Sequence, residues 1–168
     1  CLYCAQDEIL IAGDQLLPRI TSNVLVMGTE PEANPLQLWF QSLTRLEELA
    51  PNTLVLPSHE RVFRGLHTRT QEVREHHEHH CDMVRMYLTQ RESCTSYEAM
   101  KHLFPKLRSA VDDMLGLGET IAHLSWLRYA GMLRRVLDED GVYRFSFADA
   151  SYALTRPAAV TVDAAATA

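Results

Sequence analysis

Two short apolar segments with an amphipathic helix between them constrain the fold of this chain most strongly. The apolar segments are residues 8–12 (Glu-Ile-Leu-Ile-Ala) and 53–56 (Thr-Leu-Val-Leu). Between them, Asn34-Pro35 supplies an N-cap and a first helical residue, and apolar side chains then recur at helical spacing to about residue 50. This strand–helix–strand order predicts an α/β fold. We expect residues 8–12 to be covered on both faces, and a further strand at residues 2–5.

A carboxylate and an imidazole come directly after these two predicted strands. Gly13-Asp14 ends the first strand and Pro57-Ser58-His59 ends the second. Because α/β proteins place ligands at the carboxyl ends of their strands, Asp14 and His59 are expected to converge if the strands are neighbours. A carboxylate with an imidazole suits Zn, Fe or Mn, although a zinc site needs three or four ligands. The alternative for Asp14 is a turn residue that caps local N–H groups.

Length and charge limit the classes of partner. The 168 residues are enough for one ordinary domain or two small ones, and 16 Lys and Arg against 22 Asp and Glu give a net charge of −6. This balance argues against nucleic acid or an anionic membrane as a partner. No apolar stretch of about 20 residues and no signal peptide is present, so we expect a cytoplasmic protein.

A long helix is predicted from about residue 66 to residue 89, and it carries the sequence His76-His77-Glu78-His79-His80-Cys81. His76 and His80 stand four residues apart and could chelate one ion. However, His77 and His80 fall on the apolar stripe of this helix, where side chains pack in the core. We therefore favour packing over metal binding for these histidines.

The sequence pattern changes at Thr95, where the long predicted helix gives way to shorter elements. Thr95-Ser96-Tyr97-Glu98 is a capping box that opens a short helix, and further helices are predicted at 106–115 and 119–130, separated by a turn at 116–118. Residues 133–137 and 142–147 then form a predicted hairpin with an aromatic face. Three helices and a hairpin predict a winged-helix-like module at residues 93–150, after an α/β part at 1–92 and before an Ala-rich tail at 151–168. Its acidic hairpin tip would repel phosphates, which favours packing or homodimerisation over nucleic-acid binding.

The four cysteines do not build a metal site or a disulfide framework in this interpretation. Cys1-x-x-Cys4 has zinc-ribbon spacing, but the second pair that a ribbon requires is absent. In a strand, residues three apart point to opposite faces, which suits neither chelation nor a bridge. We expect free thiols in a reducing compartment.

Several segments together resemble one family. They are residues 9–23 around Ala12-Gly13-Asp14, the stretch from Ser42 to Pro57-Ser58-His59, Phe63-Arg64-Gly65, and His76-His77. These segments resemble the C-terminal half of metallo-β-lactamase superfamily hydrolases. The later module, with Glu119 and Ala122-His123-Leu124, resembles the appendix of the hydroxyacylglutathione-hydrolase-like branch.

This resemblance implies part of an αββα sandwich that binds one or two metal ions, usually zinc, with Fe or Mn as alternatives. It matches Asp14 to the aspartate that bridges two metals and His59 to the last histidine ligand. The implied mechanism is attack by a metal-bound hydroxide while the metals stabilise the oxyanion. The loop at residues 16–23 could line the substrate pocket.

The sequence also departs from the family pattern. The His-x-His-x-Asp-His motif and a later histidine ligand are absent, and Glu60 stands where a glycine is frequent. The chain starts with Cys1 inside a predicted strand, so we expect the missing ligands in an N-terminal half that this sequence does not contain. We expect residues 1–168 alone to be inactive.

The resulting expectation is a metal-dependent hydrolase of a thioester or other acyl ester, in which Asp14 and His59 hold the metal. A ribonuclease of the same superfamily is the first alternative, and the negative net charge counts against it. A winged-helix binding module or a non-catalytic dimerisation module is the second alternative. Steep salt dependence of nucleic-acid binding would identify a nucleic-acid-binding module.

Overall fold

The computed structural model describes residues 1–153, in which four α-helices and two three-stranded sheets form a mixed α/β fold. It divides into two compact units. Residues 1–23 and 38–77 make the first, and residues 24–37 together with residues 78–153 make the second. Most of the predicted Ala-rich tail, residues 154–168, lies outside the described residues. The predicted boundary at residues 92–93 stays a prediction.

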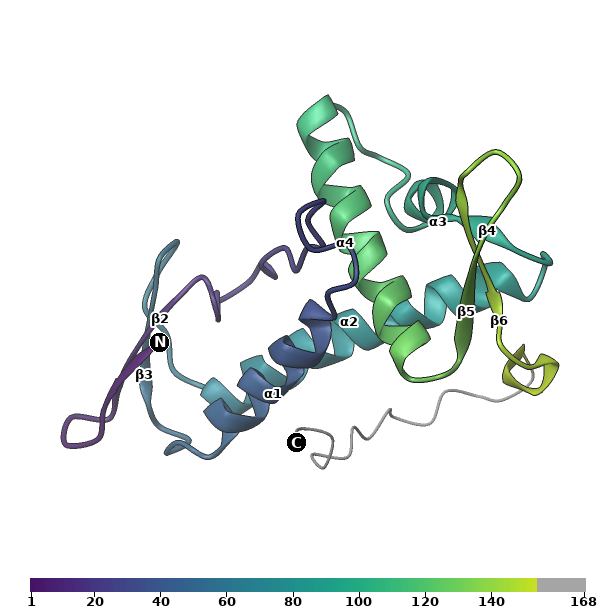
Figure 1. Cartoon of the computed structure of the whole chain (residues 1–168). Helices are drawn as coiled ribbons and strands as arrows, with labels where there is room; N and C mark the ends of the chain where they lie inside the picture. Colours follow the sequence, from purple (N-terminus) through teal and green to yellow (C-terminus); the bar gives the residue numbers. More distant parts are fainter. Residues whose placement is uncertain (154–168) are drawn as a thin grey trace. The chain divides into compact units, whose positions relative to one another are not determined.

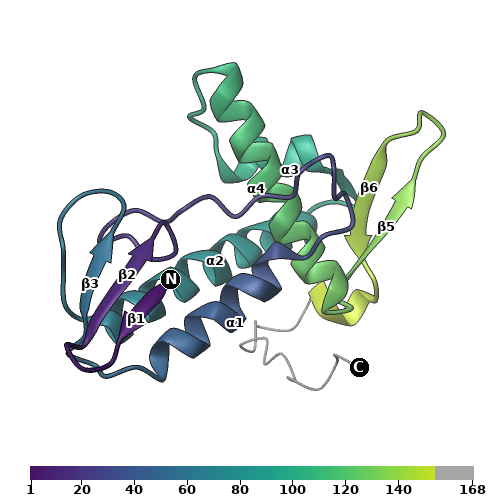
Figure 2. The same cartoon turned by 60° about the vertical axis from the view of Figure 1, so that its left-hand side comes forward.

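The first sheet has the strand order β1-β2-β3 (Figure 2). β1 pairs antiparallel with β2, and β2 pairs parallel with β3, as the strand–helix–strand pattern predicts. Along the chain, the three strands of this sheet and two helices follow in the order β1 (Leu2–Cys4), β2 (Ile9–Gly13), α1 (Pro35–Glu47), β3 (Leu54–Pro57) and α2 (Leu66–Leu88).

The prediction that β2 is covered on both faces is wrong. Leu10 and Ala12 are buried, whereas Ile11 between them is 51% exposed. Successive side chains of a strand point to opposite faces, so one face of this sheet packs in the core and the other faces outward.

The second sheet joins a hairpin to a strand of two residues (Figure 1). The two hairpin strands pair antiparallel, as predicted, and the short strand pairs with the second of them. Two residues carry no periodic pattern, which is why this strand was not predicted. The elements of this part are β4 (Cys94–Thr95), α3 (Ser96–Leu103), α4 (Ala110–Tyr129), β5 (Leu133–Leu137), β6 (Tyr143–Phe147) and the 3-10 helix η1 (Ala150–Ala153).

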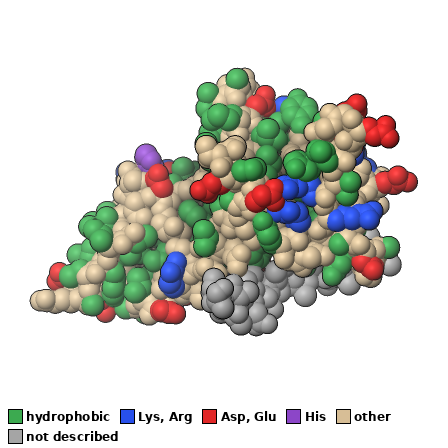
Figure 3. Space-filling model, in the orientation of Figure 1, with side chains coloured by type: hydrophobic (Ala, Val, Ile, Leu, Met, Phe, Trp, Pro, Cys, Tyr) green, Lys and Arg blue, Asp and Glu red, His purple; other side chains and the backbone are tan. Residues whose placement is uncertain are grey.

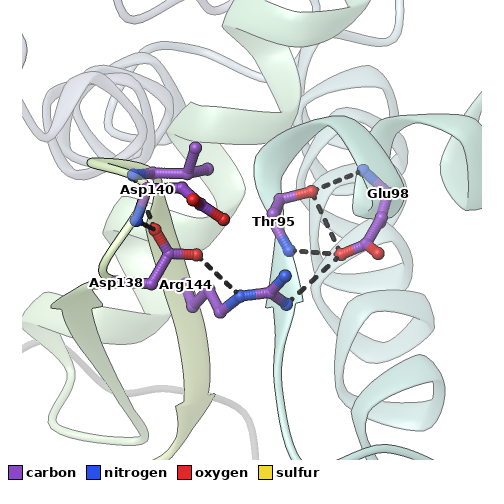
Figure 4. Close-up of polar contacts among 6 residues, drawn as sticks. Thr95, Glu98, Asp138, Asp140 and Arg144 are labelled. Carbon is purple, nitrogen blue, oxygen red and sulfur yellow. Dashed lines mark hydrogen bonds and ion pairs between the residues drawn. The ribbon is translucent and has the colours of Figure 1, made fainter.

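The capping box at the start of α3 is confirmed. The Thr95 hydroxyl accepts from the Glu98 N–H at 3.2 Å, and the Glu98 carboxylate accepts from the Thr95 N–H at 2.7 Å. Arg144 of β6 lies between this carboxylate and Asp138 of the hairpin turn, 4.0 and 3.0 Å away respectively (Figure 4). The contacts tie the start of α3 to the hairpin.

The predicted turn at residues 116–118 is wrong, because α4 runs through it without a break. Each glycine makes a close approach that a larger residue would obstruct. A Cβ on Gly116 would come within 2.8 Å of a methyl carbon of Leu107, and one on Gly118 would come within 3.3 Å of the Val26 carbonyl oxygen. Tertiary packing thus overrides the low helix propensity of glycine.

Candidate functional site

Asp14 and His59 follow neighbouring parallel strands and lie together, as the sequence predicts. The register of β2 and β3 shifts at Gly13, whose φ of +60° is a conformation that glycine adopts without strain. The Ser58 N–H donates to the Gly13 carbonyl at 3.1 Å. This bond brings the ends of the two strands together, so that His59 Nε2 lies 3.4 Å from Asp14 Oδ1.

The Asp14 carboxylate is oriented by neighbouring residues but remains open. The Ser58 hydroxyl donates to Asp14 Oδ1, and the Ser22 hydroxyl donates to the Asp14 carbonyl at 2.5 Å. The side chains of Asp14 and His59 are 64% and 65% exposed. An oriented carboxylate and an imidazole nitrogen at an open sheet edge are suitable metal donors, but two donors do not complete a zinc site.

The loop after Asp14 is fixed to the first unit by two arginines. Arg69 of α2 donates to the Leu17 carbonyl at 2.7 Å and to the Ile20 carbonyl at 2.9 Å. Arg19 forms a bidentate pair with Glu60 at 2.8 and 3.0 Å. The hydrogen bond from Arg19 holds the pKa of the Glu60 carboxyl below its usual range. Glu60 is thus an ionised partner of the loop beside His59.

His77 of α2 packs among aromatic rings, as its place on the apolar stripe predicts. It is fully buried, and its ring lies edge-on to Trp39 and Phe40 with centroid distances of 6.3 and 6.1 Å. His76 makes a third edge-on contact at 5.3 Å. These contacts place His77 in the core of the first unit.

The second unit contains a buried glutamate with two histidines near it, and all three side chains are potential metal ligands. A carboxylate oxygen of Glu119 lies within 4.8 Å of a ring nitrogen of His80 and within 4.8 Å of one of His123. The side chains of Glu119 and His80 are only 10% and 12% exposed, and His123 is fully buried. Burial raises the pKa of the Glu119 carboxyl to about 7, since a low-dielectric environment disfavours the charged form.

Sequence reasoning did not single out Glu119 and His123 as metal ligands. Their i, i+4 spacing is visible in the sequence, but the turn predicted at residues 116–118 placed Glu119 at a helix start. With α4 continuous, both residues lie well inside one helix and one turn apart.

Among residues 1–153, no helix combines the length and apolar character needed to cross a membrane.

Comparison with known proteins finds one family model that matches part of the chain. Residues 83–148 match the family described as "Metallo-beta-lactamase-like, C-terminal domain". A search of curated proteins finds no match.

Two solved structures extend the similarity over most of the chain. A β-lactamase domain protein from Burkholderia ambifaria is 41% identical with a TM-score of 0.83, over 87% of this chain and 43% of that one. A metallo-β-lactamase family protein from Thermus thermophilus is 28% identical with a TM-score of 0.72, over 86% and 44%. The chain therefore spans less than half the length of the structures that it matches, and its fold corresponds to part of theirs.

Proposed function

Because residues 83–148 match the C-terminal domain of metallo-β-lactamase-like proteins, we propose that this chain supplies part of the active site of a metal-dependent hydrolase. The observation that carries the proposal is the 3.4 Å separation of His59 Nε2 and Asp14 Oδ1 at the ends of adjacent parallel strands. The proposed substrate is a small-molecule thioester or other acyl ester, as in the hydroxyacylglutathione-hydrolase-like branch.

The donors at this sheet edge fit a zinc ion, with Fe or Mn as alternatives. Asp14 and His59 would hold it, and Ser58 would keep one oxygen of Asp14 fixed while the other stays accessible. When bound, such an ion lowers the pKa of a water ligand and polarises the carbonyl oxygen of an ester. Further ligands are required, and we propose that they come from the N-terminal half of the same protein.

The exposed face of the first sheet supports the proposal that an N-terminal half packs against this chain. Leu2 is 72% and Ile11 51% exposed, so the sheet presents apolar side chains outward. In an αββα sandwich that face would be covered by the other sheet. We propose that residues 1–92 complete such a sandwich and that residues 93–150 form a winged-helix-like module. A cytoplasmic location and a homodimer remain predictions of the sequence.

The ribonuclease alternative is disfavoured by the charges of the second unit. Arg128 and Arg135 are both engaged by Glu32, and Arg144 contacts Asp138. On the face drawn in Figure 3, basic side chains lie next to acidic ones. Paired arginines offer less positive potential to a phosphate backbone than free ones. The same observation counts against a winged-helix module that binds nucleic acid.

The test uses the longer protein that includes the N-terminal half. Zinc content and hydrolysis of a glutathione thioester are measured for the parent protein, Asp14→Ala, His59→Ala and the control Asp7→Ala. Asp7 lies in the turn between β1 and β2, at the opposite end of β2. Both site variants should lose bound zinc and at least about 100-fold in kcat/KM, whereas the control should keep both. Unchanged zinc content in Asp14→Ala would contradict the proposal.

A further inference from the structure

A groove lies along one side of the last turns of α2, within the second unit. Its volume is about 560 Å³, which is within the range of small-molecule sites. Residues of α2 and of the turn after it line the groove at positions 79, 82–83, 86–87 and 90–91, and α3 contributes His102. This spacing of three to four residues is that of one helix face, so the groove is elongated along the helix.

The floor of the groove is apolar, although this part of α2 already has a core face. Val84 and Leu88 are fully buried and form that core face. Met83, Met86 and Tyr87 line the groove instead, and Met86 is 66% exposed. A surface helix needs one apolar face for the core, so this second apolar surface is available to a ligand. Methionine side chains are flexible and polarisable, which lets them adapt to an unbranched apolar chain.

A positive charge accompanies this apolar floor. The Arg91 guanidinium lies over the Tyr87 ring, 3.6 Å from its centroid, and donates to the Tyr87 carbonyl at 3.1 Å. The His102 ring stacks on Tyr87 with a centroid distance of 4.5 Å. Within residues 1–153, no carboxylate forms an ion pair with Arg91. The guanidinium is therefore held in place while its charge stays available to an anion.

The acidic residue of the groove has a partner of its own. Asp82 is the one carboxylate among the lining residues, and its Oδ1 lies 3.4 Å from Arg85 Nη1. His79 and His102 each offer a ring N–H as a further donor. The charges and donors of the groove thus favour an anion over a cation.

We propose that this groove binds an unbranched, medium-length fatty acid. The acyl chain would lie along Met83, Met86 and Tyr87, and the carboxylate would bind Arg91, whose guanidinium can form two parallel hydrogen bonds with it. An elongated apolar floor suits an extended chain better than a compact ring. The site shares no residue with Asp14 and His59, and it does not depend on the proposed hydrolase activity.

The test titrates the 168-residue chain with sodium decanoate by calorimetry and follows the methionine methyl groups by NMR. Hexanoate tests the contribution of chain length, and decanol tests that of the charge. Arg91→Gln and Met86→Gln are compared with Arg108→Gln and Met114→Gln, which change exposed residues of the same types outside the groove. Because all four side chains are exposed, these substitutions leave the core intact.

Decanoate should bind at about one equivalent with a Kd below about 1 mM, and it should shift the methyl signals of Met83 and Met86 but not that of Met114. Hexanoate should bind at least about tenfold more weakly because fewer methylenes are buried, and decanol at least about tenfold more weakly because it lacks the charge. Arg91→Gln should lower the affinity for decanoate about tenfold and leave that for decanol unchanged. Met86→Gln should weaken the binding of both, and the two control variants should match the parent.

Equal affinities for decanoate and decanol, or equal decanoate affinities in the parent and Arg91→Gln, would overturn the proposal. Methyl shifts that leave out Met83 and Met86 would place the ligand elsewhere and overturn it as well. Analytical ultracentrifugation of the ligand-free chain examines a second copy as the occupant. A dimer that Met86→Gln dissociates and that decanoate does not compete with would assign the groove to that copy and contradict the proposal.

Discussion

At the scale of single residues, two serines hold Asp14 in different ways. Ser58 donates to its carboxylate, and Ser22 donates to its main-chain carbonyl. A hydrogen bond to a metal-binding carboxylate fixes its orientation, so Ser58→Ala should lower zinc affinity by about tenfold in the longer protein. Ser22→Ala is the matched control and should have a smaller effect. Equal zinc affinities in the parent and Ser58→Ala proteins would show that Ser58 does not position the carboxylate.

Glu119 predicts a pH dependence of stability. Its pKa rises from 4.5 to about 7 in the folded chain, so the folded state retains this proton between these values while the unfolded state has lost it. The free energy of unfolding should therefore fall as the pH rises from 4.5 to 7, by up to about 3 kcal/mol from this group. Glu119→Gln should remove that part of the decrease.

The measurement is urea unfolding of the metal-free chain at several pH values, with EDTA present throughout. Glu92→Gln, an exposed carboxylate, serves as the control and should follow the parent curve. Parallel pH curves for the parent and Glu119→Gln would mean that Glu119 does not retain its proton in the folded state.

The four cysteines should differ in reactivity. Burial raises the pKa of the Cys94 thiol to about 11 and raises that of Cys81 further, whereas Cys1 and Cys4 are exposed. Since the thiolate is the reactive species, two thiols should react rapidly with a disulfide reagent at about pH 8 and two slowly. Mass spectrometry of the labelled peptides identifies them, and all four should react rapidly in denaturant. Rapid labelling of Cys81 in the native chain would contradict its burial.

At the scale of elements, the glycines of α4 predict opposite tolerances. Ala is about 1 kcal/mol better than Gly in a helix interior, but a Cβ at either position meets a neighbour. At Gly116 the nearest atom is a methyl carbon of Leu107, which can move, whereas at Gly118 a backbone oxygen of Val26 lies at 3.3 Å. Gly118→Ala should therefore be less stable than Gly116→Ala in thermal unfolding. The reverse order would show that the Val26 segment moves easily.

The helices and strands differ in how well the sequence predicted them. The capping box at Thr95, the hairpin and the long α2 were predicted because each depends on residues close together in the chain. The continuity of α4 depends instead on residues that approach Gly116 and Gly118 through tertiary packing, which no local pattern reveals. β4 is held by its pairing with β6 and therefore left no signal of its own.

At the scale of the whole molecule, the two metal-binding candidates differ in how far the sequence predicts them. The meeting of Asp14 and His59 follows from strand ends, which apolar runs locate well. The group around Glu119 requires a residue of α2 to approach α4, and only the fold shows this. The family resemblance did not supply it either, because the motifs that carry it mark segments of the chain and say nothing about which side chains are buried.

The second unit is built from two separate stretches of the chain, and Glu32 connects them. Its carboxylate pairs with Arg128 and Arg135, and its carbonyl accepts from the Tyr129 hydroxyl at 2.6 Å. Glu32→Gln should therefore increase amide hydrogen exchange in residues 24–37, with less difference at high salt. Glu139→Gln, an exposed carboxylate in the hairpin turn, should leave these amides unchanged. Unchanged exchange in Glu32→Gln would assign the order of this segment to its other contacts.

The ion pairs of Glu32 also link the evolution of the C-terminal elements to that of a residue far earlier in the chain. Arg128 and Arg135 lie about 100 positions further along the chain, yet they depend on a residue that precedes α1. A recombination event that exchanged residues 93–150 alone would separate these arginines from a carboxylate suited to them. Changes at the two places must therefore accompany one another in any lineage that keeps these ion pairs.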